Sequence, residues 1–275
     1  GLRGAKTLKG YSVSRSMDDE QGCSVSVPTK NRDKTYIALT NFETTDEQLE
    51  GALNKNPDRT LARYEKINKL VNDILRTKQR TDYVVFQECS VPRRWAMSIS
   101  GKLARQGISL ITGVEYYDPN KGSNIIRNDC LVSLATRWPG YASNFVFMKP
   151  KLLPSHGEFR MLKKAKKRQC QPITENDILP IYAHGNCYFG VLICSDLTTP
   201  ENRARFQGIV YSLCVLDWNQ DVKSFSYLVE GAAHDIHTFV VQVNNRKYGD
   251  SRVRAPYRKE HKRDSVRLKV GIQDY

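Results

Sequence analysis

A short, wholly apolar segment follows an amphipathic helix in the first third of the chain. Residues 60–74 carry apolar side chains at intervals of three and four, which predicts a helix with one buried face. The next apolar segment, Tyr83–Phe86, is β-branched or aromatic at every position. Such a segment is typical of a strand covered on both faces, so this part of the chain favours a layered α/β fold.

The alternation of helix and strand continues along the chain. Further strands are predicted at residues 35–39, 109–114, 130–135, 145–148, 212–216 and 239–243. A hairpin is predicted over residues 181–194, with its turn at residues 184–186. Helical spacing recurs at residues 93–106, 200–205 and 225–237. No internal repeat is visible, and the whole pattern indicates an α/β fold built in layers.

The positive charge of the chain is concentrated in a few segments. The formal net charge is +14, and residues 160–168 and 252–269 each hold six more basic than acidic side chains. Residues 1–34 hold three more, so the remainder is close to neutral. Such basic runs form a solvated surface or attract anionic substrates and nucleic acid. Within residues 252–269 only Tyr257 interrupts the charges, which does not support single-strand stacking of the kind that dedicated binders use.

The first residues predict an extension ahead of a single domain. Residues 1–33 are rich in Gly, Ser, Lys and Arg without a sustained hydrophobic period, which predicts a basic linker, with the folded domain at 34–275. The chain begins at Gly1 without an initiator Met or an apolar signal core, so we expect a piece of a longer, fused protein. The apolar stretches fall far below the ~20 residues of a membrane-spanning helix, so no membrane span is expected.

Cysteine and histidine usage indicates neither disulfides nor a metal. The seven cysteines are scattered, odd in number and without a Cys-x-x-Cys pair, which argues against a disulfide framework and a structural zinc site. This usage favours a reducing, cytoplasmic environment. His234 and His237 have a spacing that a metal could use, but no third ligand segment accompanies them. We therefore predict no metal and no cofactor.

Three chemically useful side chains follow predicted strands. Glu88 comes after Tyr83–Phe86, Lys149 after the strand at 145–148, and Cys194 at the end of the hairpin. Strand ends in layered α/β folds converge on one crevice. A carboxylate that takes the thiol proton, a thiolate that attacks carbon and an ammonium that stabilises negative charge together suit acyl transfer. A buried structural thiol is the alternative for Cys194.

The segments around these residues resemble a known enzyme family. Residues 82–88 (DYVVFQE) resemble the catalytic-glutamate segment of the nitrilase superfamily, the carbon–nitrogen hydrolases. Residues 149–159 (KPKLLPSHGEF) resemble its lysine segment, and residues 190–196 (GVLICSD) its nucleophile segment. The three segments occur in the order of the family, and the resemblance covers residues 34–256.

The resemblance implies a fold and a set of roles. The expected fold is a four-layer α-β-β-α sandwich. Glu88 is expected to be the general base and Cys194 the nucleophile. Lys149 and the backbone N–H of Ser195 are expected to form the oxyanion site, with Glu158 as an auxiliary acid. Lys151 is the alternative lysine, but a side chain two residues beyond the strand is expected to be more exposed than Lys149.

The resemblance also implies an activity and partners. We expect a hydrolase of non-peptide carbon–nitrogen bonds, acting on a small amide, nitrile or carbamoyl compound, in a homodimer or higher oligomer. The alternative is a binding or regulatory module within a larger nucleic-acid-associated protein, with contacts through residues 160–168 and 252–269. In outline it resembles the nitrilase-like domains joined to reverse transcriptases of antiviral defence, although these residues contain no polymerase motif.

Overall fold

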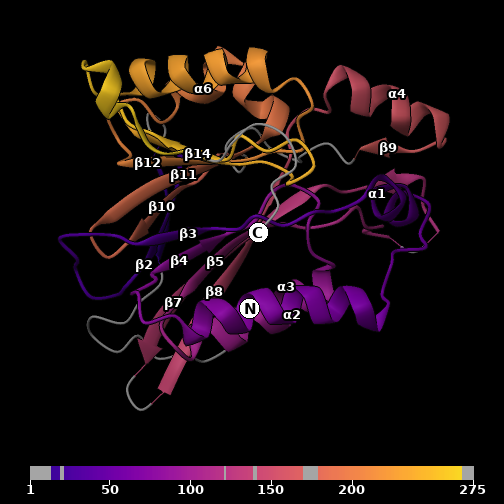
Figure 1. Cartoon of the computed structure of the whole chain (residues 1–275), viewed down its shortest axis with the longest axis horizontal. Coiled ribbons are helices and arrows are strands. Elements are labelled where there is room, and N and C mark those ends of the chain that lie inside the picture. Colours follow the sequence, from indigo (N-terminus) through magenta and orange to yellow (C-terminus); the bar gives the residue numbers. More distant parts are fainter. Residues whose placement is uncertain (1–13, 19–21, 121, 139–140, 170–178, 268–275) are drawn as a thin grey trace.

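Two β-sheets lie face to face, with helices on their outer sides (Figure 1). The computed structural model describes residues 14–18, 22–120, 122–138, 141–169 and 179–267. One sheet has α2 and α3 on its outer face, and the other has α6 (Figure 1). The predicted α-β-β-α layering is therefore confirmed. None of the helices in the described residues combines the length and apolar character needed to cross a membrane.

The five-stranded sheet carries the first half of the chain. Its order is β3 (Ile37–Leu39), β4 (Tyr83–Val85), β5 (Ser109–Gly113), β7 (Asp129–Trp138) and β8 (Tyr141–Pro150). The first three strands are parallel, and β7 and β8 are added antiparallel. The carboxyl ends of β3, β4 and β5 therefore share one edge of the sheet.

The eight-stranded sheet carries most of the second half. Its order is β1 (Ser14–Asp18), β2 (Gly22–Val27), β10 (Ile181–His184), β11 (Cys187–Ile193), β12 (Ser212–Leu216), β13 (Phe239–Val243), β14 (Arg252–Arg254) and β15 (Asp264–Arg267). Strands β11, β12 and β13 are parallel, and β10 and β11 form the predicted hairpin. A small separate sheet joins β6 (Ile125–Ile126) to β9 (Arg168–Gln169).

The helices are α1 (Asp46–Leu53), α2 (Leu61–Arg76), α3 (Arg93–Ala104), α4 (His156–Lys164), α5 (Pro200–Ala204) and α6 (Val222–Ile236), with 3-10 turns η2 (Cys194–Thr198) and η3 (Glu260–Lys262). The spacing of apolar residues predicted α2, α3, α5 and α6. It did not predict α1 or α4, which are short and mostly polar. Each of these two begins with a capping box, at Thr45 and Ser155, which satisfies N–H groups at the start of the helix.

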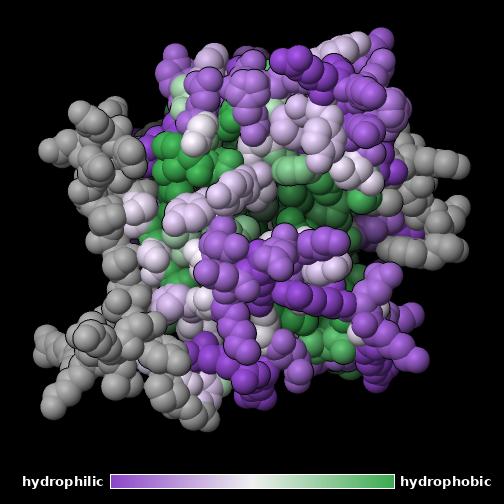
Figure 2. Space-filling view, turned by 90° about the vertical axis from the view of Figure 1, so that its left-hand side faces the viewer, coloured by the Kyte–Doolittle hydropathy of each residue, from purple (hydrophilic) through white to green (hydrophobic). Residues whose placement is uncertain are grey.

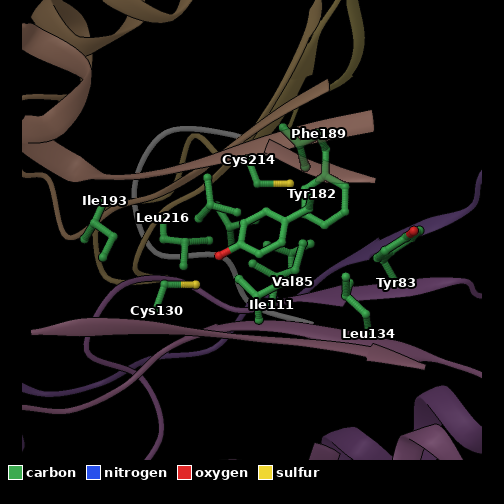
Figure 3. Close-up of a cluster of buried hydrophobic side chains, with 14 of the residues drawn as sticks. Tyr83, Val85, Ile111, Cys130, Leu134, Tyr182, Phe189, Ile193, Cys214 and Leu216 are labelled. Carbon is green, nitrogen blue, oxygen red and sulfur yellow. The ribbon is translucent and has the colours of Figure 1, made fainter. Parts of the chain in front are cut away.

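The main core lies between the two sheets. Figure 3 shows side chains of both sheets pointing toward one another, with Val85 and Ile111 on one side and Phe189 and Leu216 on the other. Tyr182 stacks on Phe189 with ring centroids 5.2 Å apart. Two further clusters fill the layers between each sheet and its helices. Strands β4 and β11 are thus covered on both faces, as their uniformly apolar sequences require.

A buried histidine joins the sheets. His184 of β10 contacts the Tyr83 hydroxyl through Nδ1 at 2.6 Å, and its Nε2 lies 2.7 Å from the Ala135 carbonyl oxygen. Burial lowers the pKa of His184 to about 4, so the ring is neutral near pH 7. A neutral ring can accept from Tyr83 and donate to Ala135, and both bonds cross between the sheets.

The expected linker at residues 1–33 is wrong for part of that segment. Strand β2 pairs in parallel with β10, and β1 pairs with β2, so residues 14–18 and 22–27 extend the eight-stranded sheet. Val25 and Val27 are buried in the core between the sheets. Their alternation with polar residues spans only a few positions, which is too short to stand out in a basic, polar sequence. Residues 1–13 lie outside the described residues.

Candidate active site

Glu88 is placed by an abrupt turn beyond β4. Phe86 N–H donates to the Ile111 carbonyl, which continues the pairing with β5, and Cys89 has a φ of 50°. A Cβ at Gly113 of β5 would lie 2.5 Å from the Gln87 carbonyl oxygen and from Glu88 Cα, so only glycine allows this approach. The turn directs the Glu88 carboxylate into a cavity, where it accepts from Asn128 Nδ2 at 2.7 Å.

Cys194 lies at the corresponding position of the other sheet. It follows Ile193, the last residue of β11, and begins the 3-10 turn η2. Its φ of 44° is unusual for a residue with a side chain, and such strained conformations cluster at active sites. Cys194 is 8% exposed and lines the same cavity as Glu88. The structure therefore brings together the predicted carboxylate and the predicted thiol.

The structure places Lys151, and not Lys149, in the cavity beside Glu88. Lys151 Nζ lies 2.7 Å from Glu88 Oε1 and 2.5 Å from Glu158 Oε2, and Lys151 lines the cavity. Lys149 does not line it, and its Nζ lies 2.5 Å from Asp196 Oδ2. The expectation that Lys151 would be exposed was wrong, because α4 folds back over the end of β8. Its side chain is only 2% exposed.

Lys149 has a different place in the structure. Its ion pair with Asp196 is fully buried on both sides. The Asp196 carboxylate also accepts from the backbone N–H groups of Ile193 and Leu152, at 3.2 and 3.0 Å. These bonds connect the end of β8 to both sides of the turn at Cys194. Lys149 therefore helps to hold the turn at Cys194 in place through Asp196.

Glu158 lines the same cavity as Glu88 and Cys194. It lies in the first turn of α4, where its Oε2 accepts from Ser155 N–H in the capping box. Its Oε1 accepts from the Tyr116 hydroxyl at 2.5 Å and from Asn128 Nδ2 at 3.2 Å. Asn128 thus bridges Glu88 and Glu158. Tyr116 and Asn128 were not predicted. Tyr116 comes two residues after the strand predicted at 109–114 but lies in none of the three matched segments, and Asn128 precedes the strand predicted at 130–135.

The two carboxylates have opposite pKa shifts. Burial, together with the charge of Glu158, raises the pKa of Glu88. Burial acts in the same direction on Glu158, but the Lys151 ammonium and hydrogen bonds from Lys151 and Tyr116 outweigh it and lower that pKa. The pKa of Lys151 is raised well above its ordinary value, because both carboxylates outweigh desolvation. Paired groups with such divergent pKa values are typical of acid–base sites.

The Cys194 thiol is protonated in this environment. Burial and the adjacent Glu88 charge raise its pKa well above the ordinary value, against the influence of Lys151. A thiolate therefore forms only if a base takes the proton as the reaction proceeds. Glu88, with its raised pKa, is the carboxylate suited to that transfer.

The cavity has a volume of about 470 Å³. Glu88, Lys151 and Cys194 line it together with residues from α1, from α4 and from the loop that follows β12. The sequence did not predict the contribution of α1. Ser195 follows Cys194 in η2, and its hydroxyl donates to the Leu153 carbonyl at 3.0 Å.

No protein-family profile and no curated protein matches the chain. Solved structures do match it. A Cys-to-Ala variant of an amidase of the nitrilase superfamily from Nesterenkonia is 15% identical, covering 88% of this chain and 89% of that one, with a TM-score of 0.56. A CN-hydrolase superfamily protein from Xanthomonas campestris, with an arsenic adduct in its active site, is 13% identical over 87% of each chain, with a TM-score of 0.57.

A further match is a Glu-to-Gln variant of the Nesterenkonia amidase that carries acrylamide added at its active-site cysteine. It is 14% identical, covering 86% of this chain and 90% of that one, with a TM-score of 0.58. The chain therefore has the α/β fold of nitrilase-superfamily structures. At these identities the likeness concerns the fold.

Proposed function

We propose that the protein hydrolyses a non-peptide carbon–nitrogen bond, with Cys194 as nucleophile, Glu88 as general base and Lys151 as the cationic group. One observation carries this proposal: the ends of β4, β8 and β11, from two different sheets, deliver these three side chains to one cavity. Each has the chemistry that acyl transfer from an amide requires. Structural neighbours described as amidases support the same class of reaction.

In the first half of the reaction, Cys194 Sγ attacks the carbonyl carbon of a bound amide while Glu88 takes the thiol proton. The negative charge that develops on the carbonyl oxygen is stabilised by the Lys151 ammonium, and we assign the Ser195 N–H as the second donor. Glu88 then gives its proton to the departing nitrogen. The carbon–nitrogen bond breaks, the amine or ammonia leaves, and a thioester remains on Cys194.

In the second half, water attacks the thioester carbon and Glu88 accepts a proton from it. The carbon–sulfur bond breaks, the product acid is released, and the proton returns to Cys194. Glu158 keeps Lys151 charged throughout, because its lowered pKa keeps it ionised. Tyr116 and Asn128 hold Glu158 in place. We therefore assign Glu158 a positioning and electrostatic role.

The test is release of ammonia from a panel of small amides and nitriles, including acrylamide and propionamide, by the full chain. We expect turnover of at least one compound and none by Cys194→Ala. An acyl-enzyme trapped at Cys194 and found by mass spectrometry would support the covalent step. Full activity in Cys194→Ala would overturn the proposal.

A further inference from the structure

The end of the molecule opposite the catalytic cavity has a basic groove. Its volume is about 860 Å³, and the loop after β2, the segment before β4 and the far part of β7 form it. Four basic side chains line it, Lys30, Arg32, Arg80 and Arg137, and Asp82 is the one acid among its described lining residues. The groove lies where β4 and β5 begin, whereas the catalytic residues follow the ends of strands.

Two of these cations are unneutralised. Asp82 Oδ1 forms ion pairs with Arg32 Nη1 at 2.8 Å and with Arg80 Nε at 3.0 Å. Lys30 and Arg137 are exposed and have no ion-pair partner in the part of the chain that the structure describes. The groove therefore keeps an excess of positive charge, available to an anion such as a phosphate.

Aromatic side chains are exposed at the same end. Tyr36 lies one residue before β3 and is 44% exposed, with the Arg80 guanidinium 5.4 Å from its ring centroid. Tyr188, near the start of β11, and Tyr211, just before β12, have ring centroids 6.1 Å apart. Tyr211 is 65% exposed. The β10–β11 turn connects these rings to the groove, because Asn186 donates to the Arg32 carbonyl at 2.9 Å.

A second aromatic pair continues into a basic segment. Phe239, the first residue of β13, and Tyr257 have ring centroids 6.1 Å apart, and both are exposed. Tyr257 is followed by Arg258, Lys259 and, in η3, Lys262, all exposed. Figure 2 views this end of the molecule, where hydrophobic areas reach the surface between hydrophilic side chains. Residues 252–269 contain a single aromatic residue, Tyr257. The aromatic partner of Tyr257 comes from elsewhere in the chain, because Phe239 is the first residue of β13.

The mouth of the catalytic cavity carries acidic side chains. Acidic side chains from α1 and from the loop after β12 line that cavity beside Glu88, namely Asp46, Glu50 and Asp221. The other basic run, 160–168, begins in α4, which covers the catalytic cavity and lies at the other end of the molecule from η3 (Figure 1). The acids oppose a polyanion at the mouth of the cavity, while the basic run that begins in α4 is a second cationic surface at that end, without the exposed aromatic pairs of the strand starts.

We infer that a single strand of nucleic acid binds across this end. The surface, here called the aromatic-basic face, comprises Lys30, Arg80, Arg137, Tyr36, Tyr188, Tyr211, Phe239, Tyr257, Arg258, Lys259 and Lys262. The cations of this face other than Arg80, which is paired with Asp82, bind the phosphates. Exposed rings stack on unpaired bases, whose faces are inaccessible in a duplex. The binding is independent of the hydrolase chemistry proposed above.

The test measures fluorescence anisotropy of a labelled 20-nucleotide oligothymidylate with the full chain, over a series of salt concentrations. We expect binding that weakens as salt rises. Tyr188→Ala with Tyr211→Ala should weaken binding at least tenfold without changing the salt slope. Lys30→Ala with Arg137→Ala should lower the slope by about 1.4, because each of the two lost phosphate contacts on a single strand contributes about 0.7.

The matched control removes two charges elsewhere. Lys163→Ala with Lys164→Ala, both exposed on α4, should change the affinity less than twofold and leave the slope unchanged. A duplex of the same length should bind at least tenfold more weakly than the single strand. The inference is overturned if the oligonucleotide does not bind at 50 mM salt. It is also overturned if the variant with both Tyr188→Ala and Tyr211→Ala binds with the affinity of the unmodified protein. Equal weakening by the α4 control or equal binding of the duplex also contradicts it.

Discussion

Lys149 and Asp196 form an ion pair with no exposed surface, 2.5 Å between Nζ and Oδ2, directly behind the turn that carries Cys194. Removing one partner of a buried pair leaves an unpaired charge, which costs roughly 3–5 kcal/mol. We predict that Lys149→Ala lowers the free energy of unfolding by about that amount, measured by urea denaturation. A loss below about 1 kcal/mol would show that Asp196 does not depend on Lys149.

Lys151 should behave differently from Lys149. The ammonium of Lys151 is placed to stabilise the oxyanion, and such donors contribute about 2.7–4 kcal/mol to the transition state. Lys151→Met is therefore expected to lower kcat by on the order of 10²–10³ in protein that still folds, as circular dichroism would check. If Lys151→Met kept near-normal turnover, the assignment of the cationic group would be wrong.

The rate should depend on pH through Glu88. Its pKa is raised above the ordinary value of 4.5, so its base form is lost at a higher pH than in a free glutamate. Activity should then decline as pH falls through this raised value. Glu158→Gln removes a charge that raises the pKa of Glu88, so the acid limb of the profile should shift to lower pH.

The control for that shift is Glu50→Gln, which removes an exposed carboxylate at the mouth of the same cavity. The acid limb of the pH–rate profile of Glu50→Gln should match that of the unmodified protein. A Glu158→Gln profile that also matched it would mean that Glu88 and Glu158 are not coupled in the way the geometry indicates.

Two glycines offer a matched test of the Glu88 turn. In Gly113→Ala, the new Cβ meets the backbone of Gln87 and Glu88 at 2.5 Å, so both stability and turnover should fall. In Gly101→Ala, the Cβ meets nothing within 4 Å inside α3, and stability should rise by roughly 0.5–1 kcal/mol. Thermal unfolding of both variants, with turnover of Gly113→Ala, checks the pair.

The layered fold and two of the three central residues could be predicted from the sequence because they follow from strand burial. Tyr83–Phe86 and the strand before Cys194 are apolar, so the sequence shows where each strand ends. Glu88 comes two residues after the first segment and Cys194 directly after the second. The lysine could not be chosen in the same way. Its choice depends on α4, whose capping box brings Glu158 over the end of β8.

Tertiary contacts also explain what else was missed. Helix α1 is a short polar helix, and its contribution to the cavity arises only when it packs beside Cys89 and Tyr116. The aromatic-basic face has no local pattern either. Tyr36, Tyr211 and Phe239 are far apart in sequence and lie at one end of the molecule because each is at or just before the start of a strand.

We expect Cys194 to react as part of a unit with Glu88 and Lys151. This expectation is tested most directly by the rate of iodoacetamide labelling at each cysteine near neutral pH, measured by peptide mass spectrometry. We predict that Cys194 labels faster than Cys89, its buried neighbour in the cavity, and that Glu88→Gln or Lys151→Met changes the Cys194 rate. Labelling of native Cys194 no faster than that of the other cysteines, and no faster than in unfolded protein, would contradict the account.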